Sequence, residues 1–353
     1  MAARKHIVYF EIMGIVEEFN RIIAEQGDIE MTQLAYDMPD DALQAQFDTA
    51  VGYQIRGNRT ALPEAFSGHR DFIARCPNLL AISTSGAGYE VINVADCTEA
   101  GVAVVNQAGT NAEGVAEHAL AQMMCLSRQM AQSDKAMRRD RNWVRRDFAG
   151  HNISGKTVGI MGMGAIGQTL TKFCQAFGMR ILTSHPRLTA EEAARRGAEL
   201  VPFDELLAES DFVAVAMPRN AETEGMFDAR AFALMKPTAF FVTVGRGGIH
   251  VDDDLVDALE KGAIAGAGVD VWLVEPPALD HPLLRFDNVL ATPHNAGMTW
   301  ENWIKMAQGS ATQWVQILNG ERPPRLVNPE VWPHYAERFE AIMGHPVREG
   351  DAE

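Results

Sequence analysis

The sequence predicts an α/β fold of two doubly wound parallel sheets, and three observations support this fold class. Short apolar runs alternate with amphipathic stretches along the chain, as expected for strands that are joined by helices. The alternation occurs in two series, and a long helical run follows each of them. A glycine-rich turn, Gly-Met-Gly-Ala-Ile-Gly, starts at Gly162 just after the first strand of the second series.

The first series predicts a parallel sheet covered by helices. It begins with a strand at His6–Phe10 and a helix at about Ile15–Ala24. Further strands are expected at Thr32–Tyr36, Ala50–Ile55 and Leu79–Ser83, with helical segments between them, and the series ends at the apolar run Val102–Val105.

The second series follows a long helix that is predicted at Asn111–Ala131, where Ala, Leu and Met recur at helical spacing. The arginine-rich stretch Lys135–Phe148 is interpreted as a solvated surface helix and loop. Six strands are then expected, at 156–161, Arg180–Thr183, Phe212–Ala216, Ala239–Thr243, Ala265–Asp270 and Val289–Thr292. Such a doubly wound sheet is typical of dinucleotide-binding domains.

Two long helices flank the second series, the later one at about Thr299–Leu318, and this predicts one domain inserted into another. We expect residues 1–105 and 300–353 to form a substrate-binding (catalytic) domain. Residues 106–299 would form the dinucleotide-binding domain, and the cleft between the two would be the natural place for a ligand.

Composition limits the partners of the chain. Its 353 residues are 47% hydrophobic and 22% charged, which is ordinary for a globular protein of about two domains. A net charge of -16 disfavours nucleic-acid binding, and no apolar run approaches the roughly 20 residues that a membrane span needs. The four cysteines share no C-x-x-C spacing, so we expect core thiols, no metal site and a cytoplasmic location.

The glycine-rich turn follows a β-rich run and opens a helical run, which is the context of a dinucleotide phosphate site. Gly162 allows the tight turn, Gly164 lets a pyrophosphate approach the backbone, and Gly167 lets helix and strand pack closely. Ala165 and Ile166 begin the helix, whose N-terminus offers amide donors and its positive dipole end to phosphates. The alternative is a glycine-lined turn that binds nothing.

The end of the next strand bears on the choice of cofactor. A ribose-binding carboxylate is missing there, and Ser184, His185 and Arg187 occupy the segment. Hydroxyl and cationic groups suit a 2′-phosphate, so the sequence favours NADP over NAD. NAD stays open, because Arg187 could instead start the next helix or stack on the adenine.

Three polar residues, Arg246, Glu275 and His294, follow strands of the second series. The carboxyl ends of such strands face the ligand crevice. The guanidinium of Arg246 could bind a carboxylate through two hydrogen bonds, and its flanking glycines would let a substrate come close. A carboxylate beside an imidazole orients it and favours its protonated form, so Glu275 and His294 could protonate a carbonyl oxygen as hydride reaches the carbon.

These motifs together resemble the D-isomer-specific 2-hydroxyacid dehydrogenase family, which includes glyoxylate/hydroxypyruvate reductases and phosphoglycerate dehydrogenases. The resemblance covers nearly the whole chain. Its motifs are Ser85-Gly-Ala-Gly-Tyr, Asn111-Ala-Glu-Gly-Val-Ala-Glu-His, the glycine-rich turn, Gly245-Arg-Gly-Gly, Gly266-Ala-Gly-Val-Asp-Val with Glu275-Pro, and Thr292-Pro-His. It implies two Rossmann- or flavodoxin-like domains and NAD(P)-dependent hydride transfer between nicotinamide and a small 2-oxo or D-2-hydroxy acid.

The resemblance also implies roles for residues that touch the substrate. Arg246 would bind the substrate carboxylate, His294 would be the acid/base, and Glu275 would tune it. The glycine loop of the first domain would offer the backbone amides of Ala87 and Gly88 to the same carboxylate.

Further roles implied by the resemblance concern the cofactor and the assembly. Asp270 would lie by the nicotinamide amide, and Val115 and Thr243 would line the cofactor groove. The family is usually dimeric through the cofactor domains, so we expect a homodimer in which the Asn111–Ala131 helix takes part.

Departures from the family pattern leave the substrate open. Thr243 replaces a common asparagine, and Val251 stands where an acid often follows the arginine motif. The segment Gly52–Arg59 is a candidate side-chain pocket, in which Gln54 or Arg56 could meet a polar substrate tail or else face solvent.

The same residues bear on three rival functions. Formate dehydrogenases of this fold have glutamine beside the histidine, so Glu275 argues against them, whereas phosphite oxidation stays open. A cofactor-sensing scaffold like the C-terminal binding protein corepressors would bind partner peptides, and no sequence feature suggests a peptide groove.

Overall fold

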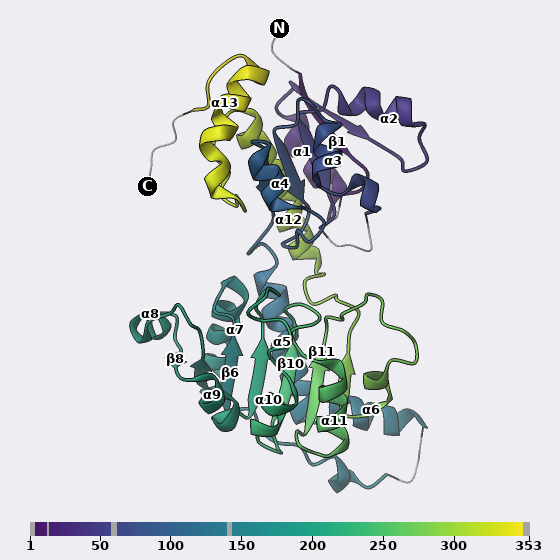
Figure 1. The fold of residues 1–353 in the computed structure, drawn as a ribbon. Coiled ribbons are helices and arrows are strands. Elements are labelled where there is room, and N and C mark those ends of the chain that lie inside the picture. The colour runs from purple at the N-terminus through teal and green to yellow at the C-terminus, as the bar shows by residue number, and fades with distance from the viewer. Residues whose placement is uncertain (1–3, 13, 58–61, 140–142, 349–353) are drawn as a thin grey trace. The chain divides into compact units, whose positions relative to one another are not determined.

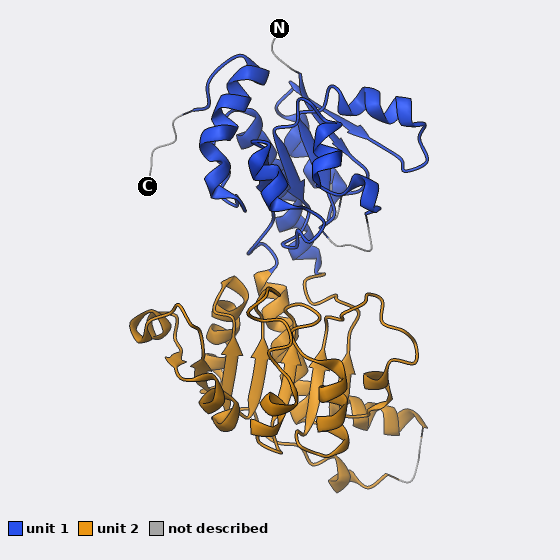
Figure 2. Cartoon of the chain, in the orientation of Figure 1, with its two compact units in different colours: residues 1–111, 299–353 blue, residues 112–298 orange. Residues whose placement is uncertain are grey.

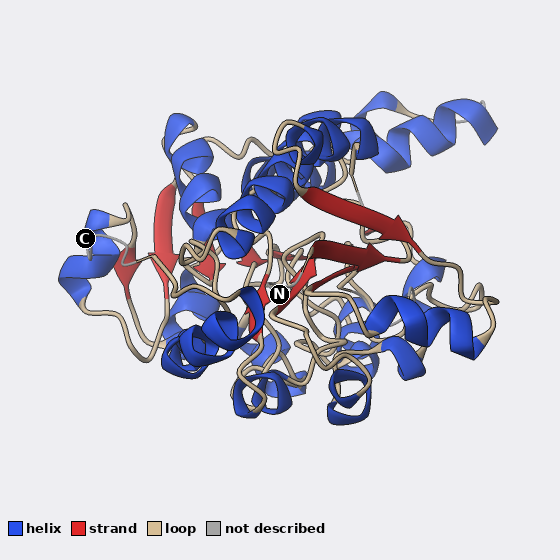
Figure 3. Ribbon diagram, turned by 90° about the horizontal axis from the view of Figure 1, so that it is seen from above, coloured by secondary structure: helices blue, strands red, loops and turns tan. Residues whose placement is uncertain are grey.

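The computed structural model describes residues 4–12, 14–57, 62–139 and 143–348 (Figure 1). The chain forms two compact units, shown in different colours in Figure 2. Met1–Asn111 and Thr299–Glu353 make up the discontinuous unit, and Ala112–Met298 make up the inserted unit. Each unit contains its own sheet, and Figure 3 distinguishes the strands from the helices that flank them.

The discontinuous unit contains a five-stranded sheet in the order β2-β1-β3-β4-β5, and every neighbouring pair is parallel. Its strands are β1 (Lys5–Tyr9), β2 (Ile29–Gln33), β3 (Gly52–Ile55), β4 (Ala81–Thr84) and β5 (Ala103–Val105). This order is that of the flavodoxin-like doubly wound fold.

Successive strand residues point to opposite sides of the sheet, so each face presents side chains of its own. Helices cover both of these faces. Ile7 of β1 belongs to a core with Phe19 and Trp314, while the adjacent Val8 belongs to a second core with Phe47. The first core joins the sheet to α1 (Val16–Ala24), α12 (Trp300–Leu318) and α13 (Trp332–Met343). The second joins it to α2 (Asp40–Phe47), α3 (Arg70–Ala74) and α4 (Val94–Glu99). Two short 3-10 helices are η1 (Glu64–Phe66) and η4 (Pro329–Val331).

The inserted unit contains a seven-stranded sheet in the order β12-β11-β10-β9-β6-β7-β8, again with parallel pairs only. Its strands are β6 (Thr157–Met161), β7 (Arg180–Thr183), β8 (Glu199–Leu200), β9 (Phe212–Val215), β10 (Phe240–Thr243), β11 (Gly266–Val269) and β12 (Val289–Ala291). The strand order reverses between β6 and β9, and ligands of open α/β sheets bind outside the carboxyl ends of the strands at such a point.

The inserted unit also has a core on each side of its sheet. Phe212 and Ala214 of β9 belong to one core, and Val213 and Val215 belong to the other. Helices α5 (Ala112–Ser127) and α7 (Ala165–Ala176) contribute to the first core, and α9 (Phe203–Glu209), α10 (Ala229–Leu234) and α11 (Asp252–Glu260) contribute to the second. The remaining helices are α6 (Met130–Arg139), α8 (Ala190–Arg195), η2 (Arg145–Phe148) and η3 (Pro282–Arg285).

The predicted α/β class with two parallel sheets is confirmed, with three local differences. The strand expected at Thr32–Tyr36 lies at Ile29–Gln33. The helix expected at Asn111–Ala131 is divided, because Gln129 adopts a left-handed φ of 49° between α5 and α6. The tail, for which no element was predicted, contains α13, which buries Tyr335, Phe339 and Met343.

The cysteines are free, and three of them are buried. Burial raises the pKa of Cys76, Cys97 and Cys174 to about 12, so these thiols stay neutral and unreactive. Within the described ranges, no group of three or more His, Cys, Asp or Glu side chains is arranged to hold a metal ion. In that part of the chain no helix combines the length and apolar character that crossing a membrane requires.

Candidate active site

The glycine-rich turn connects β6 to α7 at the carboxyl edge of the inserted unit's sheet. Gly162 has a φ of 103°, and a Cβ there would lie 2.8 Å from the Ala216 backbone. A side chain at Gly167 would collide with the carbonyl oxygen of Gly162. A Cβ at Gly164 would meet no described atom within 4 Å, so the space beside the start of α7 is open. The first and third glycines thus shape the turn, and the second leaves room for a ligand.

The segment after β7 holds the residues predicted to bind a 2′-phosphate, and a carboxylate from another loop lies against one of them. The Arg187 backbone N–H donates to His185 Nδ1 at 3.0 Å. The Arg187 guanidinium donates to Glu222 at 3.2 Å, and both side chains are largely exposed. Sequence reasoning missed Glu222 because it lies 35 residues further along the chain, in the loop after β9.

Glu275 and His294 are in direct contact, although 19 residues separate them. His294 Nδ1 lies 2.9 Å from Glu275 Oε1 and 2.8 Å from Oε2. The imidazole side chain is 39% exposed and the carboxylate 24%, so the pair is sheltered yet reachable. Because Nδ1 donates to the carboxylate, Nε2 is the ring nitrogen that this contact leaves for a substrate.

The electrostatics of Glu275 favour its ionised form. Burial is the largest single influence and would raise the pKa of Glu275, whereas the hydrogen bond and charge of His294 lower it. The Trp272 backbone N–H and the charge of Arg246 act in the same direction, and the net result is a pKa below the ordinary value. Glu275 is therefore a carboxylate at neutral pH and can stabilise a protonated imidazole.

Arg246 lies in the loop that follows β10. Its Nη1 donates to the Gly245 carbonyl oxygen at 2.8 Å, and its charge reaches Glu275. A side chain at Gly247 would collide with the Trp272 carbonyl group, so this loop packs directly on the loop after β11. The structure thus brings Arg246, Glu275 and His294 to one edge of one sheet.

Asp270 is fully buried at the end of β11 and holds the loop that carries His294. Its carboxylate accepts from the Thr292 hydroxyl at 2.6 Å and from the backbone N–H groups of Asn295 at 3.0 Å and Ala296 at 3.1 Å. These bonds reach residues on both sides of His294. The nicotinamide contact expected for Asp270 remains a prediction beside this observed role.

Two further residues of the predicted cofactor groove are buried. Thr243 ends β10, and its hydroxyl has no hydrogen-bond partner among the described residues. Such an orphaned buried hydroxyl is a group that a bound ligand can satisfy. Val115 of α5 is only 5% exposed and packs in the core that α5 shares with α7.

In the discontinuous unit, Ala87 and Gly88 lie in the loop after β4. The Ala87 carbonyl oxygen accepts from Asn106 Nδ2 at 2.9 Å. A side chain at Gly57 would collide with the Gly88 carbonyl group, so the loops after β3 and β4 touch.

Comparison with known proteins agrees with this arrangement. The family model for the D-isomer specific 2-hydroxyacid dehydrogenase, NAD binding domain, matches residues 120–296. The chain belongs to the D-isomer specific 2-hydroxyacid dehydrogenase family.

The family contains relatives of two lengths. The D-3-phosphoglycerate dehydrogenase of Archaeoglobus fulgidus is 36% identical over 274 residues, which are 77% of this chain and 51% of that protein. The glyoxylate reductase of Pyrococcus furiosus is 36% identical over 269 residues, which are 74% of this chain and 80% of that protein. The chain thus spans about half the length of the phosphoglycerate dehydrogenases that it matches.

A solved member of the family has the same fold. The crystal structure of a glyoxylate reductase from Paecilomyes thermophila superposes with a TM-score of 0.81 at 28% identity, covering 94% of this chain and 99% of that chain.

The inserted unit fits the family's dinucleotide. Open space beside Gly164, the orphaned hydroxyl of Thr243 and the start of α7 all lie at the carboxyl edge of the sheet. In its described surroundings the start of α7 has no side-chain cap and no acidic residue in its first turn, so its amides suit phosphate oxygens.

One hypothesis about the family's substrate pocket is wrong. Gln54 is fully buried, and its Oε1 accepts from Ser310 Oγ at 2.9 Å and from Trp314 Nε1 at 2.7 Å. Its amide is therefore committed to the core and cannot meet a substrate tail. Arg56 pairs with Glu11 at 2.8 Å, while Asn58 and Arg59 of the same segment lie outside the described residues.

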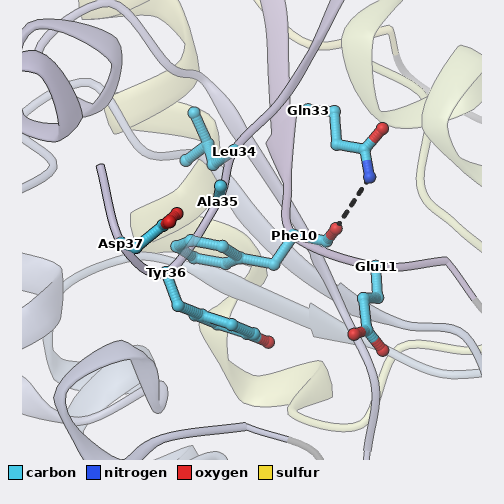
Figure 4. A pocket seen from close by; sticks show the side chains of 7 residues that line it. All are labelled: Phe10, Glu11, Gln33, Leu34, Ala35, Tyr36 and Asp37. Atoms are coloured by element: carbon cyan, nitrogen blue, oxygen red, sulfur yellow. Dashed lines mark hydrogen bonds between the residues drawn. The ribbon is translucent and has the colours of Figure 1, made fainter.

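A pocket of about 430 Å³ opens at the carboxyl ends of β1 and β2 (Figure 4). The rings of Phe10 and Tyr36 stack in it with centroids 4.4 Å apart. Its other lining residues are Glu11, Gln33, Leu34, Ala35 and Asp37. Sequence reasoning missed this pocket because no motif marks the two strand ends that form it.

Proposed function

We propose that the chain is an NAD(P)-dependent oxidoreductase that interconverts a small 2-oxo acid and its D-2-hydroxy acid, with a glyoxylate- or hydroxypyruvate-type substrate. The contact between His294 and Glu275 at 2.8 Å carries this proposal, because an imidazole held by a carboxylate can act as a proton donor to the substrate oxygen. The names of the relatives, glyoxylate reductase and D-3-phosphoglycerate dehydrogenase, support the substrate class.

Substrate binding would begin with the carboxylate. Arg246 is proposed to bind it, since a guanidinium stays charged at any working pH and offers two parallel donors. The backbone amides of Ala87 and Gly88 are proposed as further donors. These contacts would orient the oxo group for reaction.

Proton transfer would use the free side of the imidazole. In the reductive direction, Glu275 accepts a hydrogen bond from Nδ1–H, and protonated His294 donates its Nε2 proton to the carbonyl oxygen, which leaves a neutral imidazole. In the oxidative direction, neutral Nε2 takes the proton of the substrate hydroxyl. A bound nicotinamide supplies or accepts the hydride.

NADP is proposed as the preferred cofactor. Ser184, His185 and Arg187 offer hydroxyl and cationic groups after β7, where a ribose-binding acid is absent from the sequence. A 2′-phosphate would have to compete with Glu222 for the Arg187 guanidinium. The preference for NADP over NAD is therefore expected to be modest.

A homodimer formed through the inserted unit is also proposed. Helix α6 has no buried residue along its described length, and Met130 and Met137 are 54% and 49% exposed. Such apolar side chains on an uncovered helix suit a partner surface. Light scattering on the purified chain tests this, and a monomeric mass at all concentrations would refute it.

Turnover tests the main proposal. The chain is mixed with NADPH or NADH and with glyoxylate, hydroxypyruvate or phenylpyruvate, and cofactor absorbance is followed. We expect oxidation of the cofactor with at least one 2-oxo acid. Binding without turnover on any of them would favour a cofactor-sensing scaffold, and reduction of NAD(P) by phosphite would favour the phosphite alternative.

A further inference from the structure

Trp272 connects the two loops that carry Glu275 and His294. It lies just after β11 and is only 5% exposed. Its backbone N–H donates to Glu275 Oε1 at 3.1 Å, and its indole Nε1–H donates to the carbonyl oxygen of Thr292 at 2.9 Å. One residue thus holds the carboxylate directly and holds the histidine loop two residues before the imidazole.

The histidine loop needs such restraint because His294 has a φ of 53°. Residues other than glycine seldom adopt this left-handed conformation, and it persists where surrounding contacts over-determine it. Asp270 binds the backbone after His294, through Asn295 and Ala296, and Trp272 binds the backbone before it, at Thr292. The two anchors together fix the direction in which the imidazole leaves the chain.

The Thr292 hydroxyl adds a third anchor from α5. Because it donates to Asp270, it must accept from its other partners, which are His118 Nε2 at 3.1 Å and Gln122 Nε2 at 3.3 Å. His118 therefore carries its proton on Nε2. The histidine loop is tied to α5 as well as to the loop after β11.

Trp272 is itself fixed on its far side. Its ring meets the His281 ring edge-on, with centroids 5.1 Å apart. The Leu283 N–H donates to His281 Nδ1, so His281 Nε2 carries the proton and donates to Asp252 at 3.2 Å. Asp252, at the start of α11, also lies 2.9 Å from His250 Nε2. Burial would raise the pKa of Asp252, but the nearby imidazoles of His250 and His281 lower it overall, so the contacts behind Trp272 end on a carboxylate.

We propose that Trp272 is a positioning residue for the reaction: its indole N–H holds the histidine loop at Thr292, so that Nδ1 of His294 stays on the Glu275 carboxylate and Nε2 is presented in one orientation. The inference rests on the proposed acid/base role of His294. A tryptophan that only filled the core would contribute packing, which phenylalanine largely retains. A positioning tryptophan depends on its indole N–H, and that difference separates the two roles.

The experiment removes the indole donor in two ways in the full-length chain. Trp272→Phe keeps an aromatic ring against His281, and replacement of Trp272 by its benzothienyl analogue keeps the full ring shape without the N–H. The matched control is Tyr335→Phe, which deletes another buried aromatic donor to a backbone carbonyl, that of Ile317, in the discontinuous unit.

Three measurements are made on each variant: steady-state kinetics with NADPH and the best 2-oxo acid, the pH profile of kcat, and the low-field proton NMR signal of His294 Nδ1–H. Both Trp272 variants should lose about tenfold in kcat, the size that one buried hydrogen bond supports, with KM for NADPH within about twofold. The pH profile should shift, and the low-field signal should broaden or disappear. Tyr335→Phe should leave all three unchanged.

The benzothienyl variant decides the outcome if the phenylalanine variant folds poorly. Wild-type kcat, pH profile and low-field signal in that variant would overturn the proposal. Failure of the underlying function looks different, because His294→Asn would then keep wild-type turnover whatever the Trp272 variants do.

Discussion

The two units share one architecture but use the carboxyl ends of their strands differently. In the discontinuous unit, Gln54 at the end of β3 is fully buried and binds Ser310 and Trp314 of α12, so its polar atoms fasten a helix to the sheet. In the inserted unit, Glu275 and His294 remain partly exposed and ionisable. The same layered architecture therefore gives a buried polar network in one unit and partly exposed, ionisable groups in the other.

The largest test of this contrast is His294→Asn. Asparagine keeps a hydrogen-bonding side chain but cannot carry the proton, so kcat should fall by about 10²–10⁴ while NADPH affinity survives. Kinetics and cofactor titration measure the two effects, with the exposed His151→Asn as control. Near-wild-type turnover would remove His294 from the chemistry.

Arg246→Ala should have the next largest effect. Without the guanidinium, a carboxylate substrate loses its charged anchor, so KM should rise and kcat fall, with kcat/KM lower by about 10²–10³. Arg230→Ala, which breaks only an exposed ion pair with Asp204, is the matched control. An unchanged kcat/KM would dismiss the carboxylate contact.

Gln54→Leu tests the buried polar network of Gln54, Ser310 and Trp314. It leaves the buried Trp314 Nε1 and the Ser310 hydroxyl without their acceptor, which costs about 1–3 kcal/mol in the free energy of unfolding. Urea denaturation measures the loss, and the exposed Gln308→Leu on the same helix is the control. Because this network is structural, kcat per folded molecule should change little, and a large fall in kcat would contradict the comparison.

Arg187→Ala should give the smallest effect. Arg187 is exposed and already pairs with Glu222, so its contact with a 2′-phosphate would contribute little binding energy. KM for NADPH should therefore rise by only about three- to tenfold, with KM for NADH unchanged. Arg195→Ala, on the exposed side of α8, serves as control. Equal losses for both cofactors would reject the 2′-phosphate contact.

The sequence predicted the buried strands well and the edges of the fold less well. A central strand of a parallel sheet is a continuous apolar run, and β9 begins where its pattern predicts and ends one residue earlier. The edge strand β2 is only partly buried and mixes polar with apolar residues, so its predicted position was three residues too late. Helix α13 follows a proline-rich stretch and was missed, because only packing against the sheet reveals its apolar face.

The candidate site shows the same division. Arg246, Glu275 and His294 could be selected from sequence because each follows a strand, and such strand ends gather at one edge. Trp272 and Glu222 could not, because their roles arise from contacts with residues 20 and 35 positions away. Gln54 was misjudged because the sequence around an amide in a strand does not show whether its partner is a substrate or a tryptophan of a distant helix.

The split organisation of the chain has a consequence for its synthesis on the ribosome. The inserted unit is one continuous stretch, so it can fold as soon as Met298 has emerged. One face of the β1–β5 sheet, by contrast, is covered only by α1 until α12 and α13 have been translated. At that stage the nascent chain therefore has a complete inserted unit and a β1–β5 sheet with one apolar face only partly covered. This interval is when chaperones would be needed most.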